Sequence, residues 1–446
     1  MRVKQSVTWL RTALHALGST AGGAMAISLM TMAPVQTVEA QSTPTCAVAW
    51  SSSAVYTAGN TASENGTNYV ANWWTQGNDP ATNSGGAGSG QPWTSQGACS
   101  GSGSSGGGST GGGSSGGGTG GGGTATPPGT GASLLFSPYK DVTVNLNWNT
   151  NVMQTAAATG SAIPVVGSGS LKSNYVTDLS AITLAFATGE CGSENWGGVP
   201  GATFASANIS ALSNASLPYV VSTGGEAGTF TCGSTAGFAS FLSRYMSPQM
   251  VGVDFDIEGG QTQAQISALV AAAVYGQSLY PNLRFSFTLA TLGASDGSYG
   301  GVNSLGDEVV KAIKASSLTN YTINLMVMDF GGPSSSVCVV SGSVCDMGQS
   351  AIQAAVNLEH TYGIPASKIE LTPMIGVNDV SSENFSIANT DTVVNYAVAN
   401  GLAGVHFWSL DRDTPCSQST ASPTCNSVSS TTPLEYTKRA LTDLGR

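Results

Sequence analysis

Charged residues are scarce in this sequence, and basic ones are the scarcer kind. Only 9% of its 446 residues are charged, with 14 lysines and arginines against 25 acids, and the formal net charge is −11. Nucleic acids and anionic membrane surfaces are bound through basic patches, which this composition does not supply. We therefore expect a neutral partner, with no nucleic acid and no membrane.

The chain also lacks a long uninterrupted apolar run. Near the N-terminus, basic residues precede an apolar stretch that contains AMAISLMTMA, and small residues follow up to Ala40. This order is typical of a secretory signal, residues 1–40, cut after Ala40. A membrane anchor is the alternative, but glycines interrupt the run. We predict a secreted, extracellular protein that acts as a monomer.

Histidine is equally rare, with three in the chain, and no Cys/His cluster has the close spacing of a zinc site. We expect no metal and no cofactor. An even number of cysteines in an exported chain suggests disulfides, and all eight lie beyond Ala40. We predict nearest-neighbour pairing: Cys46–Cys99, Cys191–Cys232, Cys338–Cys345 and Cys416–Cys425.

Glycine and serine, by contrast, dominate residues 100–133, which cannot bury a core and are typical of a flexible linker. The linker divides the chain into a small region, residues 45–99, and a large one, residues 134–446. The small region holds half of the eight tryptophans. We expect Trp50 and Trp93 in its core.

Adjacent residues on a strand point to opposite faces, so at least one of Trp73 and Trp74 should face solvent, where it could stack on a sugar ring. The segments AWSSSAVYTAGN, YVANWWTQG and WTSQGAC resemble the chitin-binding modules of carbohydrate-binding module family 5/12. This resemblance implies a small all-β module whose binding surface contains Tyr56 and one or both of Trp73 and Trp74.

The large region contains eight short apolar runs, and helical patterns lie between several of them. The runs are 141–148, 181–187, 219–224, 250–258, 283–290, 322–330, 369–376 and 404–410. Eight strand-then-helix units in about 310 residues predict an α/β fold, a (β/α)8 barrel with its active site at the carboxyl ends of the strands. A doubly wound sheet is the alternative, but no Gly-rich phosphate turn follows the first run.

The fourth run, MVGVDFDIEGG, places three acids at alternate positions. On a strand, Asp254, Asp256 and Glu258 would share one face, while Val253 and Phe255 face the other way. An edge strand with outward charges is the alternative. Crowded acids raise one another's pKa values, which suits proton transfer, with Glu258 best placed as a general acid.

The GVDFDIE segment is similar to the acidic signature, ending in Asp-x-Asp-x-Glu, of glycoside hydrolase family 18, the chitinases, and further segments look like a bacterial subgroup. The resemblance implies substrate-assisted, retaining hydrolysis. Glu258 would protonate the glycosidic oxygen and later activate water. Asp256 would orient the N-acetyl group and stabilise an oxazolinium ion, and Asp254 would share a proton with Asp256.

The same resemblance makes Trp408 the floor under the reacting sugar and places Met326 and Asp329 on the rim. Trp148 and Ser222, which close two other strands, are further candidates for substrate binding. Two departures from the family pattern stand out. Val251 replaces the first Asp of the signature, and Met328 stands where the family often has Tyr.

About 27 residues separate Gly376 from Gly404, too few for the small domain that walls the cleft of some chitinases. We therefore predict an open groove and endo-type cleavage of chitin and of N-acetylglucosamine oligomers. One alternative is a non-catalytic chitin-binding lectin on the same barrel, which would usually lack Glu258. Another is a related hydrolase of peptidoglycan or of N-glycan cores.

Overall fold

The structure is a computed structural model that describes residues 44–52, 54–56, 60–72, 75–85, 91–100 and 134–446. The predicted signal, almost all of the linker and the Trp73–Trp74 pair lie outside the described residues. Within the described part, no helix is long and apolar enough to cross a membrane.

The N-terminal module is all β. Its strands are β1 (Val55–Tyr56), β2 (Thr61–Glu64), β3 (Thr67–Ala71), β4 (Thr75–Gln76) and β5 (Trp93–Ala98). β2, β3 and β5 form an antiparallel sheet, and β1 pairs with β4. Trp93 is fully buried in a small core, as predicted, whereas Trp50 is half-buried and packs against that core. The Cys46–Cys99 disulfide joins the two ends of the module.

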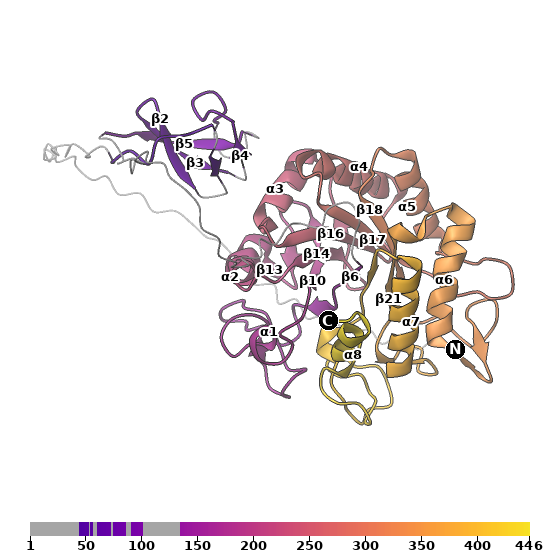
Figure 1. The fold of residues 1–446 in the computed structure, drawn as a ribbon. Coiled ribbons are helices and arrows are strands. Elements are labelled where there is room, and N and C mark those ends of the chain that lie inside the picture. Colours follow the sequence, from indigo (N-terminus) through magenta and orange to yellow (C-terminus); the bar gives the residue numbers. More distant parts are fainter. Residues whose placement is uncertain (1–43, 53, 57–59, 73–74, 86–90, 101–133) are drawn as a thin grey trace, which may run out of the picture.

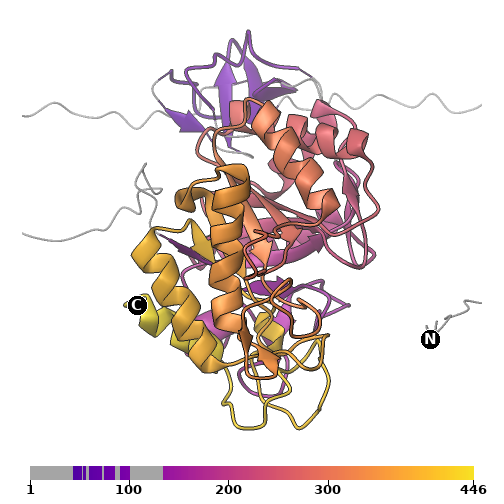
Figure 2. The ribbon, with the colours of Figure 1, turned by 90° about the vertical axis from the view of Figure 1, so that its right-hand side faces the viewer.

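The C-terminal domain is a ring of parallel strands surrounded by helices (Figures 1 and 2). The strands are β6 (Leu135–Phe136) with β7 (Tyr139–Asp141), β10 (Ile182–Ala187), β14 (Tyr219–Gly224), β16 (Met250–Ile257), β17 (Arg284–Ala290), β18 (Tyr321–Met326), β21 (Ile369–Thr372) and β24 (Gly404–Val405). The helices are α1 (Leu171–Asn174), α2 (Gly201–Asn214), α3 (Thr235–Tyr245), α4 (Gln263–Leu279), α5 (Ser304–Ala315), α6 (Met347–Tyr362), α7 (Ile387–Asn400) and α8 (Glu435–Asp443). A helix follows each strand, as a (β/α)8 barrel requires.

The first strand closes the barrel, and Pro138 interrupts it. β6 pairs with β24 and β7 pairs with β10, so one short stretch of chain joins the last strand to the second. Because proline has no N–H group, it breaks a ladder of hydrogen bonds. The backbone N–H of Tyr139 nevertheless donates to Phe407 O at 3.0 Å, which carries the closure past Pro138.

The predicted first strand, residues 141–148, is wrong, because this segment is mostly turns. The carboxylate of Asp141 accepts bonds from the backbone and hydroxyl of Thr143, and Lys140 Nζ donates to Val144 O at 2.9 Å. Such local side-chain bonds compete with a strand ladder. The other seven runs contain the predicted strands, although the segments at 369–376 and 404–410 form only short ones.

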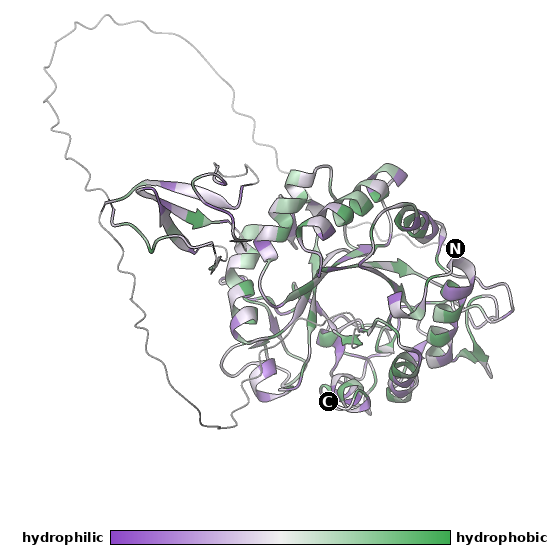
Figure 3. Ribbon diagram, turned by 45° about the horizontal axis from the view of Figure 1, so that its top comes forward, coloured by the Kyte–Doolittle hydropathy of each residue, from purple (hydrophilic) through white to green (hydrophobic). Residues whose placement is uncertain are grey.

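The fold class is confirmed, and so is the nearest-neighbour disulfide pairing, which holds for all four bridges. Between β21 and β24 the chain forms only a hairpin of β22 (Gly376–Val377) with β23 (Asn384–Phe385), followed by α7. The expected absence of a small domain at this place is therefore confirmed. Apolar colour marks much of the strands of the ring in Figure 3.

Candidate active site

The fourth strand of the barrel, β16, separates acids from apolar residues as the sequence predicts. Val253, Phe255 and Ile257 are buried in the core, and the Phe255 ring lies 6.1 Å from that of Phe238 on α3. Successive residues on a strand face opposite sides, so Asp254 and Asp256 point into the barrel. Both are buried, and Glu258 follows directly after the strand ends.

Asp254 lies inside the barrel and accepts hydrogen bonds from hydroxyl groups on three other strands. Its Oδ2 accepts from Ser222 Oγ at 2.6 Å and from the Tyr139 hydroxyl at 3.0 Å. Its Oδ1 accepts from Thr288 Oγ1 at 2.7 Å and from Ser286 Oγ at 2.8 Å. Burial raises the pKa of Asp254, and these four bonds to the charged form oppose the rise.

Asp256 has no comparable support. Its side chain is buried, and its Oδ1 has no hydrogen-bond partner among the described residues. Burial, and then the charges of Glu258 and Asp254, hold the pKa of Asp256 well above its ordinary value. The bonds of Asp254 come from hydroxyl groups and not from Asp256, so the expected proton sharing between the two aspartates is not seen as a direct bond. Of the two, Asp256 is therefore the stronger holder of a proton.

Glu258 is half-buried at the carboxyl end of β16. Burial, aided by the nearby charge of Glu226, raises its pKa to about 7, although a hydrogen bond from the backbone of Glu226 lowers it. Glu226 follows Gly224 and Gly225, which let the β14 loop approach β16. Gly224 has φ of +90°, and a Cβ there would lie 2.1 Å from Asp256 O. A half-protonated carboxyl near neutral pH can both give and take a proton.

Three aromatic rings lie together near the carboxylates. Trp408 stacks on Phe186 with ring centroids 5.4 Å apart, and Tyr139 lies 6.2 Å from Trp408. Trp408 and Phe186 are both half-buried. Each therefore keeps part of its ring available, which is the property that a sugar-stacking surface needs.

The end of β18 carries the other predicted rim residues. Met326 and Met328 are half-buried there, and Asp329 follows with φ of +51°. Asp329 Oδ1 accepts from Val380 N at 2.8 Å, and burial raises its pKa. In return, Glu383 accepts from Phe330 N at 3.1 Å and Gly331 N at 2.9 Å. Reciprocal bonds thus join the loops after β18 and β21.

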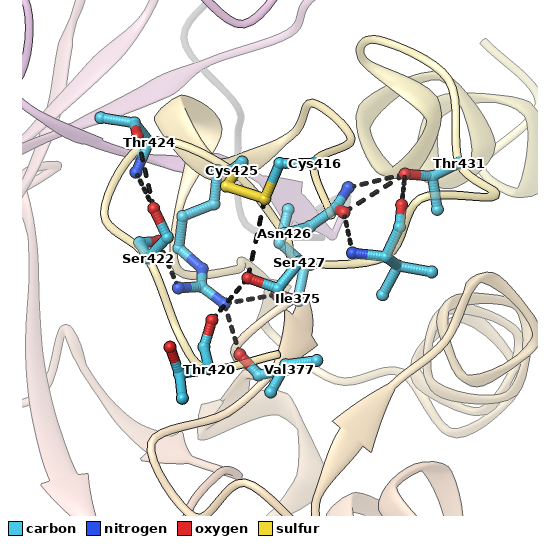
Figure 4. The surroundings of a disulfide bond; sticks show 12 residues. Ile375, Val377, Cys416, Thr420, Ser422, Thr424, Cys425, Asn426, Ser427 and Thr431 are labelled. Carbon is cyan, nitrogen blue, oxygen red and sulfur yellow. Dashed lines mark hydrogen bonds between the residues drawn. A yellow bond between two sulfur atoms is a disulfide. The ribbon is translucent and has the colours of Figure 1, made fainter. Parts of the chain in front are cut away.

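A buried arginine joins the loops after β21 and β24. Arg412 Nη2 donates to Ile375 O at 2.9 Å and to Val377 O at 2.7 Å, and Nη1 donates to Ser422 O. The Cys416–Cys425 disulfide lies in the same loop region, and Figure 4 shows its surroundings. Because every guanidinium bond found among the described residues goes to a backbone carbonyl, we assign Arg412 to loop structure.

The remaining candidates lie in varied places. Trp148 is 59% exposed in the loop that follows β7. Ser222 is fully buried beneath the carboxylates, where it donates to Asp254 instead of facing solvent. In the module, Tyr56 is half-buried and its hydroxyl accepts from Ser51 N. Trp73 and Trp74 lie outside the described residues.

Sequence reasoning missed several polar residues around Asp254, namely Tyr139, Ser286, Thr288, Asn324 and Thr372. It also missed Phe186 and Glu226. Tyr139 was missed because Pro138 precedes it and a proline argues against a strand at that place. The other residues lie on strands or in loops and belong to no recognisable motif. The described residues contain no group of three or more His, Cys, Asp or Glu side chains placed to hold a metal ion.

Comparison with known proteins identifies the module first. Residues 49–94 match carbohydrate-binding module family 5/12. Over 51 residues the chain is also 44% identical to the endoglucanase MaCel5A of Microbulbifer sp. (strain ALW1). This alignment covers 11% of this chain and 9% of that protein.

Other matches carry chitinase names. Over 178 residues the chain is 28% identical to a probable bifunctional chitinase/lysozyme of Escherichia coli (strain K12), covering 36% of this chain and 19% of that protein. The chain thus spans less than a fifth of the length of these two curated relatives. Active domain 2 of a thermostable chitinase from Pyrococcus furiosus, crystallised as catalytic-site mutants with chito-oligosaccharides, has a TM-score of 0.51 at 20% identity. That match covers 71% of this chain and 98% of the other, and it shows a shared fold.

These comparisons confirm the predicted resemblance to a chitinase with an N-terminal family 5/12 module. The module is matched by its sequence, whereas the barrel is matched mainly by its fold.

Proposed function

We propose that the protein is a secreted chitinase that hydrolyses the β-1,4 bonds between N-acetylglucosamine residues of chitin. The observation that carries this proposal is Glu258, a half-buried acid at the barrel mouth whose pKa is raised to about 7. Its neighbour Asp256 is buried, and its Oδ1 has no hydrogen-bond partner in the part of the chain that the structure describes. Such unmet bonding capacity next to a proton donor suits a polar substrate group.

The first half of the reaction needs a proton and an internal nucleophile. Glu258 gives its proton to the glycosidic oxygen as the bond from that oxygen to the anomeric carbon breaks. The carbonyl oxygen of the substrate's own acetamido group attacks the same carbon, which forms an oxazolinium ion. Asp256 accepts the acetamido N–H through its unprotonated oxygen, which stabilises the developing positive charge, and the negative charge of Asp254 beneath it adds to that stabilisation.

In the second half, Glu258 takes a proton from water as the water oxygen attacks the anomeric carbon. The bond from the acetamido oxygen to that carbon then breaks, and the configuration is retained. Trp408 would lie under the reacting sugar, with Met326 and Asp329 at the rim. Trp148 is exposed enough to stack on a sugar further along the chain, and Ser222 would act through Asp254.

The tethered module would raise the local concentration of the barrel on insoluble chitin, through Tyr56 and one or both of Trp73 and Trp74. An open groove favours cleavage within the polymer. The signal at residues 1–40 and four disulfides support secretion.

The test compares purified protein on colloidal chitin, soluble N-acetylglucosamine oligomers, peptidoglycan and an N-glycan core, by mass spectrometry of products over time. We expect short oligomers from chitin, an early fall in polymer length, and little product from the other two polymers. Binding to chitin without cleavage would establish a lectin, and faster cleavage of peptidoglycan or N-glycan would give a different hydrolase. Dimer release from the earliest times at constant polymer length would overturn endo action.

A further inference from the structure

Asn324 lies on β18 inside the barrel and is 1% exposed. Its Nδ2 group donates to the Tyr139 hydroxyl oxygen at 3.0 Å and to Thr288 Oγ1 at 2.9 Å. Its Oδ1 accepts from Thr372 Oγ1 at 2.8 Å. The amide therefore lies directly behind two of the four hydroxyl groups that surround Asp254.

The number of available protons determines the direction of each bond. A hydroxyl group has one proton, whereas the amide nitrogen of Asn324 has two and donates both. Because Tyr139 and Thr288 each accept from Asn324, each keeps its own proton for Asp254. The oxygens of Tyr139 and Thr288 lie 3.1 Å apart, so without Asn324 one hydroxyl could donate to the other instead.

The opposite amide orientation fits the site less well. With Oδ1 turned toward Tyr139 and Thr288, each hydroxyl would face two acceptors, the amide oxygen and Asp254, with one proton to share between them. Each hydroxyl could donate its proton to only one of these two oxygens. Its short contact with the other oxygen would then be a repulsive one with no proton between the two atoms. The observed orientation avoids this cost, and the Thr372 hydroxyl supports it.

We propose that Asn324 is a positioning residue that directs the protons of Tyr139 and Thr288 onto Asp254 and so favours the charged form of that aspartate. Asn324 does not itself contact the substrate. A charged Asp254 favours the proton on Asp256, its neighbour on β16. This inference rests on the proposed function only where its effect is measured through chitin hydrolysis.

Other ionisable groups also face Asp254. Tyr139 comes from β7 and Asp256 from β16 itself. Around a cavity of about 10 Å³, Arg284 of β17, Glu370 of β21 and His406 beyond β24 complete the set. The experiment leaves these groups unchanged, so any shift in the titration of Asp254 can be assigned to the amide.

The kinetic test uses Asn324→Ala and Asn324→Asp, with soluble N-acetylglucosamine oligomers as substrate. Activity requires an ionised Asp254, and loss of donors raises its pKa, so kcat/KM should begin to fall at a higher pH on the acid side than in the wild type. The negative charge of Asn324→Asp should enlarge this shift. We expect kcat to drop at least about tenfold, as for general loss of electrostatic preorganisation, with a smaller change in KM.

Asn357→Ala is the matched control. Asn357 is a buried asparagine on α6 that donates to Ala294 O at 3.0 Å and Gly300 O at 2.8 Å, far in sequence from the carboxylates. The Asn357→Ala variant should lower the melting temperature without moving the acid limb, which is the fall of kcat/KM toward low pH. If both Asn324 variants keep the wild-type acid limb, the proposal is wrong.

Melting temperature against pH provides a second readout that needs no hydrolysis. Donors to Asp254 stabilise its charged form, so the loss of stability in Asn324→Ala should be larger at neutral pH than at acidic pH. The loss in Asn357→Ala should not depend on pH. A wild type that cleaves no chitin oligomer would overturn the proposed function, whereas a pH-independent loss in Asn324→Ala would overturn this inference alone.

Discussion

Glu258 at the end of β16 and Glu383 in the loop after β21 both have pKa values that burial raises to about 7, yet their surroundings differ. Glu383 is 1% exposed and accepts two backbone N–H bonds from the neighbouring loop. Glu258 is only half-buried and has Glu226 beside it. A raised pKa alone therefore does not mark a catalytic acid, and the partners of the carboxyl group are what distinguish Glu383 from Glu258, the proposed acid.

The aspartates repeat this contrast. Asp413 is fully buried and accepts from Tyr436 N at 3.1 Å, Thr437 N at 2.8 Å and Thr437 Oγ1 at 2.6 Å. These bonds hold the start of α8 on the barrel. Asp256 is almost as buried, but its Oδ1 has no partner among the described residues. A buried polar atom without a partner is costly, which suggests that a substrate group completes its bonding.

The largest expected effect separates the two glutamates. Glu258→Gln should lower kcat on soluble oligomers by about 10²- to 10⁴-fold, the usual contribution of general acid–base catalysis, while binding of the oligomers is kept. Glu383→Gln is the matched variant. It should lose about 1–3 kcal/mol of stability, because the two N–H groups bond to different carboxylate oxygens and glutamine would turn an NH2 group toward one of them. It should keep much of its activity below its melting temperature. Equal losses of kcat in both variants would contradict the distinction between a catalytic Glu258 and a structural Glu383.

The aspartates should separate in the same way, with a smaller difference. Asp256→Asn should lower kcat by about 10²- to 10³-fold, as expected for loss of electrostatic stabilisation of the oxazolinium ion. Its melting temperature should change little or rise, because a neutral amide replaces a carboxyl group whose pKa burial raises and whose charged form burial therefore disfavours. Asp413→Asn should lower the melting temperature and leave kcat largely unchanged. Calorimetry measures the first effect and oligomer hydrolysis the second. A destabilised Asp256→Asn with normal kcat would contradict the assignment.

The sequence predicted the part of this site that one strand contains. That strand is β16, where the alternation in MVGVDFDIEGG placed Asp254 and Asp256 on one face, because the side-chain period of a strand is two. The neighbouring strand β14 also begins and ends where expected. The sequence could not identify the partners of Asp254. Tyr139 is 115 residues away in sequence and follows a proline that hid its strand.

The rim was less predictable for a similar physical reason. Glu383 and Arg412 act through backbone groups of loops that the fold brings together, and no side-chain pattern marks such pairs. A lone glutamate or arginine in a loop is most often solvated. Their structural role depends on the fold of the whole chain and so could not be read from the local sequence.

A third comparison concerns the module and the barrel. Deleting the residues before Leu134 should reduce hydrolysis of crystalline chitin by about tenfold or more, because effective concentration on the polymer is lost. Hydrolysis of soluble oligomers should stay at the full-length rate, since the residues of the proposed site all lie on the barrel. Parallel assays of reducing ends on both substrates make the test. An equal loss on both would refute a targeting role.

The smallest effect should sharpen the account of Glu258. The charge of Glu226 helps to raise the pKa of Glu258, so Glu226→Gln should lower it. Because the general acid must be protonated, the alkaline limb of kcat/KM should move to lower pH, with little change in the maximal rate. The backbone bond from residue 226 is kept, which makes the charge the main difference. A limb that stays in place would mean that Glu226 does not act on this acid.

The most direct test of the central claim is the pH dependence of kcat/KM for the wild type on soluble oligomers, which reports the ionisations of the free enzyme. We predict activity through weakly acidic pH and an alkaline limb with an apparent pKa near 7, where Glu258 loses its proton. A limb near 4.3, the ordinary value for glutamate, would contradict the claim that the surroundings of Glu258 hold its proton.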